Sequence, residues 1–300
     1  MNYSAEPFAG NVAAGGAIDS HTVLYGVIGD PVRHSKSPIM MNRAFRETSV
    51  NGVYAAFHIK EDQLAAFAGG VRAMGIRGVN VTIPHKVNIM KYLDEIDPAA
   101  AAIGAVNTIV NEDGKLIGYN TDGVGYVRSL KEEAMPSIAG KRVLVIGAGG
   151  AARGIVHALA AERPERIVIA NRSLGKAEEL AGAFANLAEL EPIASGGLEE
   201  ACGQADLVIN TTSVGMYPNV DESPVGKGWL KEGAVASDLI YNPLATRFLR
   251  EAEQLGHTVH GGLGMFIQQG AIAFEHWTGK PAPVQAMRET VLAALNGQRS

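Results

Sequence analysis

The run RVLVIGAGGAARG, residues 142–154, limits the possible folds of this chain more than any other stretch. Val143 to Ile146 is an unbroken apolar run, as expected for a strand covered on both faces of a parallel sheet. A GxGxxA pattern follows from Gly147 to Ala152 and opens a predicted helix, AARGIVHALAAE. Such a loop lets the backbone approach a pyrophosphate at the positive end of the helix. We therefore predict a Rossmann-like dinucleotide-binding domain, against the alternative of a plain glycine turn.

The end of the next predicted strand, RIVIAN (166–171), indicates which dinucleotide is bound. In NAD-binding domains a carboxylate about 20 residues past the glycine loop accepts the ribose hydroxyls, and it would repel a 2′-phosphate. This chain has Asn171, Arg172 and Ser173 there, followed by Lys176. Donors and positive charge favour NADP(H) over NAD(H). The alternative is that Arg172 covers the surface and Ser173 caps the next helix.

Short apolar runs alternate with helical patterns from residue 23 onward, which is the βαβ rhythm of a mostly parallel sheet. Residues 106–110 and 115–119 flank Asn-Glu-Asp-Gly, a hairpin turn signal, so an antiparallel pair is expected to close the first unit. The other predicted strands are residues 23–29, 53–59, 78–84, 142–147, 166–171, 205–210, 234–240 and 257–261, and the helices between them include 37–47, 61–75, 151–162, 173–187 and 245–256.

These elements predict an α/β protein of two domains, which fits a length of 300 residues. Residues 1–122 form an N-terminal α/β substrate domain with a mostly parallel sheet, and the first 20 are a loose lead. Residues 123–262 form a Rossmann-like NADP-binding domain, separated from the first by a cleft. The helices of residues 263–300 are expected to pack back on the substrate domain. Two domains joined by few segments are expected to close when ligands bind.

Composition excludes several classes of function. A formal net charge of -5 and the lack of basic clusters argue against nucleic acid and membrane surfaces as partners. The single cysteine, Cys202, rules out an intrachain disulfide framework and fits a reducing compartment. The first residues lack the pattern of a signal peptide, so we expect a cytoplasmic protein. No HExxH or similar cluster is present, and no metal is expected.

The stretch GVNVTIPHK, residues 78–86, ends a predicted strand with polar groups. Asn80 and Thr82 are two apart and share one face of the strand, and Lys86 follows just past its end. Open α/β sheets bind ligands at the carboxyl ends of their strands. Lys86 and Asp122 are the plausible acid/base partners that follow strand ends in the first domain. Their pairing is a hypothesis, because Asp122 and Asn107 can also be explained as turn and hairpin-edge residues.

Two serines precede the first predicted helix in the sequence Ser35-Lys36-Ser37-Pro38. One interpretation makes Ser37 the N-cap and Pro38 the first helical residue. Ser35 is not explained by capping, and two hydroxyls beside a helix start are suited to grip a carboxylate. The sequence leaves both interpretations open.

Several separate motifs follow one another along the chain: SKSP, NVTIPHK, GAVNT, GYNTDG, VLVIGAGGAARG, NRS, SVGM, YNP and GLGMFIQQGAIAFEHWTG. In these motifs, from about Tyr25 to the final helix, the chain resembles the shikimate dehydrogenase family. The resemblance implies a small-molecule substrate and the reversible NADP(H)-linked reduction of 3-dehydroshikimate to shikimate, in aromatic amino acid biosynthesis, by a monomer or homodimer.

The resemblance also implies a role for each matching residue. Lys86 would transfer the proton, with Asp122 as its partner. The substrate would be bound by Ser35 and Ser37 at its carboxylate and by Asn80, Thr82, Asn107, Asp122, Tyr241 and Gln269 around its hydroxyls. The cofactor would be bound by Gly147, Ala148, Gly149, Gly150 and Ala151 at the pyrophosphate, by Asn171, Arg172, Ser173 and Lys176 at the adenosine phosphate, and by Leu239, Gly262 and Met265 near the nicotinamide.

Other functions remain open at the level of sequence. One alternative is a quinate or mixed quinate/shikimate dehydrogenase that also accepts NAD, whose substrate differs by one ring hydroxyl. A non-catalytic NADP-responsive binding module is an alternative of another class, although Lys86 and Asp122 are both retained. The family often has Met-Leu before the substrate glutamine, whereas this chain has Met265-Phe266 and two glutamines. Only one of the two can face the ring, and we assign Gln269 that role and Gln268 a packing or solvent-facing one.

Overall fold

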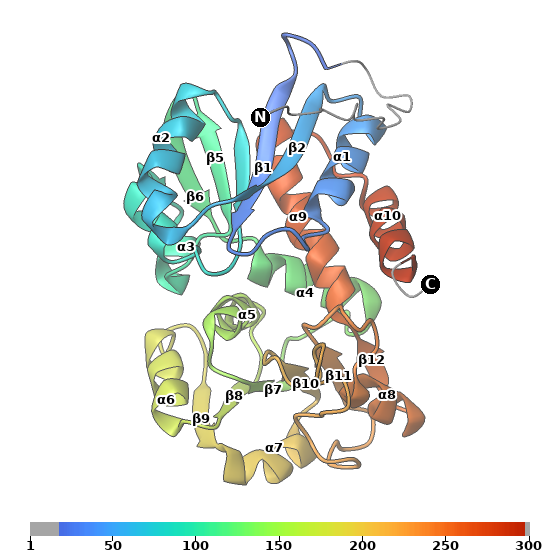
Figure 1. Cartoon of the computed structure of the whole chain (residues 1–300). Coiled ribbons are helices and arrows are strands. Elements are labelled where there is room, and N and C mark those ends of the chain that lie inside the picture. The colour runs from blue at the N-terminus through green and yellow to red at the C-terminus, as the bar shows by residue number, and fades with distance from the viewer. Residues whose placement is uncertain (1–17, 298–300) are drawn as a thin grey trace, which may run out of the picture.

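Two six-stranded sheets, stacked end to end with helices between them, organise the computed structural model, which describes residues 18–297 (Figure 1). The predicted loose lead, residues 1–20, lies almost entirely outside the described residues. Between residues 18 and 297, no helix combines the length and apolarity needed to cross a membrane.

The first sheet has the strand order β2-β1-β3-β5-β6-β4. β1 pairs in parallel with β2 and β3, whereas β5 runs antiparallel to both β3 and β6, so the predicted antiparallel hairpin is confirmed. The elements of this part are β1 (Val23–Gly29), α1 (Ser37–Glu47), β2 (Gly52–His58), η1 (Glu61–Gln63), α2 (Leu64–Ala73), β3 (Gly78–Val81), η2 (Asn88–Tyr92), β4 (Glu95–Ile96), α3 (Pro98–Ile103), β5 (Thr108–Glu112) and β6 (Lys115–Tyr119).

Both faces of the first sheet are covered, because its strands alternate apolar side chains between two cores. Val27 of β1 faces the core formed with α1, α9 (Gly262–Thr278) and α10 (Val284–Asn296). Ile28, the next residue, faces the other core, with α2 and α3. The indole of Trp277 in α9 donates a hydrogen bond to Ile109 O of β5 over 2.9 Å. The C-terminal helices therefore pack on the first sheet although they follow the second in sequence.

The second sheet is parallel, with the strand order β12-β11-β10-β7-β8-β9. The chain reverses direction of winding between β7 and β10, the order typical of the Rossmann fold. This α/β fold class agrees with the prediction. The elements are α4 (Asp122–Glu133), β7 (Arg142–Ile146), α5 (Gly150–Ala161), β8 (Arg166–Asn171), α6 (Leu174–Ala183), β9 (Leu190–Ala194), η3 (Ser195–Gly197), α7 (Leu198–Gln204), β10 (Leu207–Asn210), β11 (Val235–Asp238), α8 (Arg247–Gln254) and β12 (Thr258–His260).

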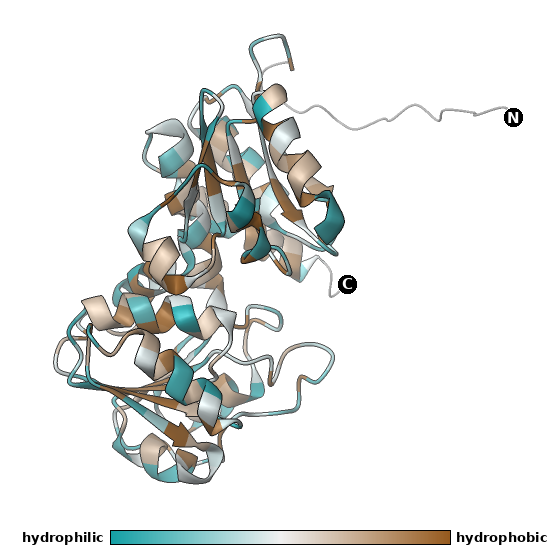
Figure 2. Cartoon of the chain, turned by 90° about the vertical axis from the view of Figure 1, so that its left-hand side faces the viewer, coloured by the Kyte–Doolittle hydropathy of each residue, from teal (hydrophilic) through white to brown (hydrophobic). Residues whose placement is uncertain are grey.

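The apolar run predicted to be covered on both faces is buried on both faces. Val143 and Val145 of β7 pack against α4, α5 and α6, whereas Leu144 and Ile146 pack on the side of α7 and α8. Figure 2 shows the strands of the second sheet as mostly hydrophobic ribbons, between helices that carry both hydrophobic and hydrophilic residues. This double cover explains why the strand reads as a continuous apolar run rather than an alternating one.

Helix α4 lies between the two sheets (Figure 1), and hydrogen bonds between buried polar side chains anchor it. Tyr126 of α4 donates a hydrogen bond to the hydroxyl of Ser237 over 2.9 Å. The ring of His260 lies 2.9 Å from Ser237 Oγ on one side and 2.8 Å from Ser129 Oγ of α4 on the other. Burial lowers the pKa of His260 to about 4, helped by the positive charge of Arg288. The imidazole is therefore neutral at physiological pH.

Candidate active site

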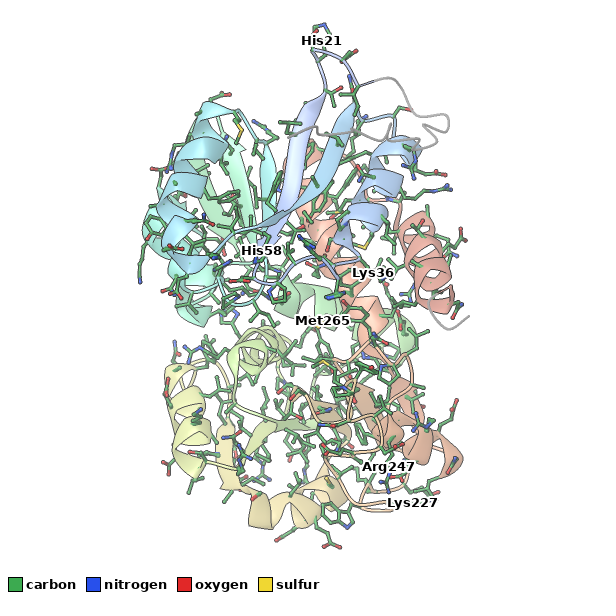
Figure 3. The ribbon with its side chains drawn as sticks, in the orientation of Figure 1. His21, Lys36, His58, Lys227, Arg247 and Met265 are labelled. Atoms are coloured by element: carbon green, nitrogen blue, oxygen red, sulfur yellow. The ribbon has the colours of Figure 1, made fainter. Side chains whose placement is uncertain are left out.

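A solvent-open cavity of about 680 Å³ lies where the strands of the two sheets end. In Figure 3, Met265 lies between the two units, with Lys36 and His58 along the facing edge of the first. The nine residues predicted to handle substrate, and three predicted to lie near the nicotinamide, line this one cavity: Ser35, Ser37, Asn80, Thr82, Lys86, Asn107, Asp122, Tyr241, Gln269, Leu239, Gly262 and Met265.

Lys86 and Asp122 form an ion pair inside the cavity, with 2.6 Å between Lys86 Nζ and Asp122 Oδ2. Lys86 comes from the turn after β3, and Asp122 is the first residue of α4, where the helix dipole stabilises a carboxylate. The side chains keep 31% and 17% of their exposure, so both remain accessible from the cavity. The geometry gives an aimed ammonium group that can exchange a proton with a bound molecule.

A buried amide fixes the carboxylate of this pair. Asn107 Nδ2 donates to Asp122 Oδ1 over 2.9 Å and to Thr121 Oγ1 over 3.0 Å. Asn107 Oδ1 in turn accepts from the backbone N–H of Thr121 over 2.8 Å. One oxygen of Asp122 is thus held by Asn107 while the other meets Lys86. The structure shows that Asn107 orients Asp122, whatever contact it makes with a substrate.

Asn80 lies on the cavity side of β3 and is also held by its neighbours. Its Oδ1 accepts from the hydroxyl of Tyr54 over 2.7 Å, and its Nδ2 donates to Thr108 Oγ1 over 3.1 Å. Burial raises the pKa of Tyr54 well above its usual range, so this phenol keeps its proton and donates it. The amide of Asn80 is therefore presented in one fixed orientation.

The interpretation of Ser37 as an N-cap is wrong. α1 begins at Ser37 itself, Lys36 occupies the N-cap position, and neither side chain caps a helix N–H. Ser35 Oγ instead accepts from the backbone N–H of Ser37 over 3.2 Å, because the chain turns before the helix. The hydroxyl of Ser37 is thus not used for capping, and both serines line the cavity at the start of a helix.

Part of the cavity wall is aromatic. The rings of Tyr241 and Phe266 stack with centroids 4.8 Å apart and planes at 22°. Burial raises the pKa of Tyr241, which keeps its hydroxyl protonated. Gln269 Nε2 donates to Phe266 O over 2.8 Å, so the predicted substrate-binding amide is bonded to its own helix and must turn to meet a ligand. Gln268 is buried and donates to Glu132 of α4 over 2.7 Å, a packing role.

The glycine loop after β7 has the geometry that a pyrophosphate requires. Gly147 has φ +112°, and a Cβ there would lie 2.6 Å from Thr211 Oγ1, so only glycine fits. A Cβ at Gly149 or Gly150 would meet no atom within 4 Å, which leaves open space above the loop. The first turn of α5 points its N–H groups into that space. Ala148 and Ala151 complete the loop, and these residues fit the phosphates of a dinucleotide.

The residues after β8 fit a further phosphate. Asn171 Nδ2 donates to Ser173 O over 2.9 Å and closes the turn. Ser173 occupies the N-cap position of α6, but its side chain makes no capping hydrogen bond. Arg172 and Lys176 are exposed, and among residues 18–297 neither has an ion-pair partner. Their charges are free for an anion, as the prediction of NADP(H) requires.

Sequence reasoning missed some residues of this site. Tyr54, Thr108 and Thr121 support the predicted residues through hydrogen bonds. Thr121 lies within the GYNTDG motif and Thr108 ends the GAVNT motif, which are the signals that could have identified them, whereas Tyr54 lies in none of the motifs. The cavity is also lined by Asp30, Pro31, Val32, His34, Val81, Ile83, Met216, Phe266 and Val27. Among the described residues, no group of three or more His, Cys, Asp or Glu could hold a metal ion.

Three family models match the chain. The shikimate dehydrogenase substrate binding domain matches residues 27–109, the shikimate/quinate 5-dehydrogenase model matches residues 129–223, and the shikimate 5'-dehydrogenase C-terminal domain matches residues 262–292. A shikimate dehydrogenase (NADP(+)) of Geobacillus sp. (strain WCH70) is 50% identical over 274 residues, which cover 91% of this chain and 99% of that protein. The chain belongs to the shikimate dehydrogenase family.

Solved structures of this family share the fold. A shikimate dehydrogenase crystallised in complex with NADP+ is 44% identical and superposes with a TM-score of 0.87, covering 94% of this chain and 98% of that one. A shikimate 5-dehydrogenase from Listeria monocytogenes, in complex with shikimate and NAD, is 40% identical with a TM-score of 0.87 and covers 91% and 98%. The family therefore includes a member crystallised with each dinucleotide.

Proposed function

We propose that this chain is an NADP-dependent shikimate dehydrogenase, an oxidoreductase that reversibly reduces 3-dehydroshikimate to shikimate. The observation that carries the proposal is the Lys86–Asp122 pair, which opens on the same cavity as Leu239, Gly262 and Met265 from the cofactor side. A substrate in this cavity would lie between a proton-transfer group and the end of a dinucleotide held along β7 and α5. Family membership supports the same substrate and cofactor.

The glycine loop and Arg172 would hold NADP(H), which would supply or accept the hydride at the reacting ring carbon. Lys86 manages the proton. In the reducing direction its ammonium group donates a proton to the oxygen on which negative charge develops, and in the oxidising direction its amine accepts the proton of the hydroxyl. Asp122 stabilises the ammonium form and fixes its direction over 2.6 Å. Asn107 holds Asp122 in place during both steps.

The remaining cavity residues bind and orient the ring. Ser35 and Ser37 line the cavity at the N-terminus of α1, where hydroxyls and the helix dipole both favour a carboxylate. The fixed amide of Asn80, together with Thr82, Tyr241 and Gln269, offers hydrogen bonds to ring hydroxyls. A site built to hydrogen-bond each hydroxyl discriminates against rings that lack one, because buried polar groups would then be left unpaired.

The experiment that tests this function compares kcat/KM for shikimate and quinate with NADP+ and with NAD+. We expect the shikimate and NADP+ combination to give the highest value. Faster oxidation of quinate with NAD+ would make the chain a quinate dehydrogenase instead. If no reduced nicotinamide forms with either acid, the binding-module alternative is supported.

We also propose that the protein acts in the cytoplasm on a small-molecule substrate. Gel filtration with light scattering will separate monomer from homodimer.

A further inference from the structure

The reaction proposed above does not use the most deeply buried carboxylate near the cavity, that of Asp238. This residue ends β11 and has no exposed surface. Its Oδ1 accepts from the backbone N–H of Ile240 over 3.0 Å, and its Oδ2 accepts from the hydroxyl of Thr246 over 2.8 Å. The amide of Asn210 donates to both oxygens over 3.2 Å. Every contact is made by a neutral donor.

Asn210 extends this arrangement to a second loop. It ends β10, beside β11, and its Oδ1 accepts from the backbone N–H of Thr212 over 3.0 Å and from the hydroxyl of Thr212 over 2.7 Å. Its Nδ2 also donates to Val214 O over 3.1 Å. Two residues further on, Met216 reaches the cavity. Asn210 thus holds the loop after β10, and Asp238 holds Asn210.

Asp238 is also bonded to the segment that follows β11. Leu239 and Tyr241, on either side of the Ile240 N–H that it accepts, both line the cavity. Met216 lines it from the other loop. Two parts of the cavity wall, from the loops after two different strands, are therefore joined through one carboxylate and one amide. We call this pair the Asp238–Asn210 clasp.

Burying the carboxylate of Asp238 in the clasp is energetically unfavourable. Burial raises the pKa of Asp238 to about 6, although the three donors, Ile240, Thr246 and Asn210, act to lower it. A buried charged or polar group can often be replaced by a well-packed apolar one without loss of stability. What an apolar replacement would not supply is a fixed spacing between the two loops. The clasp therefore fits a role in geometry better than a role in stability.

We propose that Asp238 is a positioning residue that sets the wall against which the nicotinamide end of the dinucleotide rests. The proposal rests on the proposed function, because it assigns the cofactor side of the cavity. Through Asn210 it fixes Met216, and through Ile240 it fixes Leu239 and Tyr241. The adenosine and phosphate end, bound at the glycine loop and Arg172, is held by other residues. Loosening the clasp should therefore disturb hydride transfer more than cofactor affinity.

The test begins with Asp238→Asn, which places an amide donor against the amide donor of Asn210. We expect kcat for shikimate oxidation to fall about tenfold or more, because a hydrogen bond to a charged group is lost at two loops, while the Kd for NADPH stays within about threefold. Fluorescence of bound NADPH should shift toward that of the free cofactor, since the nicotinamide is less fixed. The double variant N210D/D238N restores one donor facing one acceptor, and it should recover at least part of the lost kcat.

Two further variants separate positioning from stability. Val208→Ala shortens a buried side chain of β10 two residues before Asn210 and removes none of the hydrogen bonds of the clasp, so it should lower stability without changing kcat. Thr246→Val removes a single donor and should lower kcat about threefold; it carries the test if Asp238→Asn fails to fold. The proposal is overturned if the folded clasp variants keep kcat within twofold, or if Val208→Ala lowers it equally. A wild-type protein that binds NADPH but oxidises no shikimate would refute the proposed function instead, and the fluorescence comparison would still test the clasp.

Discussion

Replacing Lys86 by alanine is the most direct test of the catalytic assignment. A proton-transfer group is worth about 100- to 10,000-fold in rate, which corresponds to roughly 3–5 kcal/mol of activation free energy. The ion pair keeps 31% and 17% side-chain exposure, so its loss should cost only about 1 kcal/mol of stability. Asp122 keeps its hydrogen bond from Asn107. We therefore expect a folded variant with turnover reduced at least 100-fold.

The assay measures turnover by the absorbance of NADPH and cofactor affinity by fluorescence titration on the same sample. Lys86→Arg is the informative companion, because a guanidinium keeps the positive charge beside Asp122 but does not release its proton at neutral pH. It should lose turnover nearly as severely while keeping its stability. Lys91→Ala is the matched control. Lys91 lies five residues after Lys86, donates a hydrogen bond to Asn88 over 2.9 Å and does not line the cavity.

Turnover within tenfold of wild type in Lys86→Ala, with NADPH binding intact, would refute the reasoning. The proton would then have to pass through water or another side chain. Equal losses in turnover and in cofactor affinity would also contradict it, because Lys86 lines the cavity whereas the glycine loop of residues 147–151 does not.

Four other predictions follow from the structure. Arg172→Ala should raise the Kd for NADP+ by about 10- to 100-fold and leave that for NAD+ nearly unchanged, as titration calorimetry can measure. Gly125→Ala should destabilise the fold by several kcal/mol in urea unfolding, because a Cβ there would lie 2.6 Å from the α9 backbone, whereas Gly69→Ala, with open space around it, should be neutral or stabilising. The raised pKa of Asp238, about 6 against 3.8, weakens the fold as pH rises between those values, and the lowered pKa of His260, about 4 against 6.5, weakens it as pH falls between those values. The two effects, about 3 kcal/mol each, oppose one another, so the unfolding free energy of Asp238→Asn should drop more steeply than that of wild type between pH 6.5 and pH 4. Small-angle scattering should show a smaller radius of gyration with NADP+ and shikimate together than without ligands; an unchanged radius would count against closure of the cleft.

The elements with strong periodicity were predictable from the sequence. The predicted spans 23–29 and 37–47 agree with β1 and α1 at both ends, because a short apolar run and a helix-starting Ser-Pro are local signals. The short elements β4, α3, β9 and α7 were not predicted. β4 spans Glu95–Ile96 alone, and β9 is only partly buried along its length, so neither leaves a clear hydrophobic pattern. The pairing of β4 and β9 is decided by the neighbouring strands of their sheets, which lie outside the short stretch of sequence around each of them.

The residues that line the candidate site were predictable from the sequence, whereas most of the residues that support them were not. Lys86 and Asp122 follow strand ends in recognisable motifs, and the structure places them 2.6 Å apart. Other supporting contacts were not predictable, because Tyr54 reaches Asn80 from 26 positions away and the Asp238–Asn210 clasp joins residues 28 positions apart. The first contact crosses from β2 to β3 over β1, and the second joins the neighbouring strands β10 and β11, so nothing in either segment alone specifies them.

The location of Asp122 links chemistry to the connection between the two sheets. It begins α4, and the next residues of that helix pack closely on two others: a Cβ at Gly123 would collide with the backbone of Gly154 in α5, and one at Gly125 with that of Gln269 in α9. α5 carries the phosphate loop, and α9 carries a residue of the substrate cavity. Glycine therefore lets one helix touch the cofactor side and the substrate side at once. Asp122, which pairs with Lys86, is the first residue of that helix, so the proposed proton-transfer pair lies at the start of the element that packs on both of these helices.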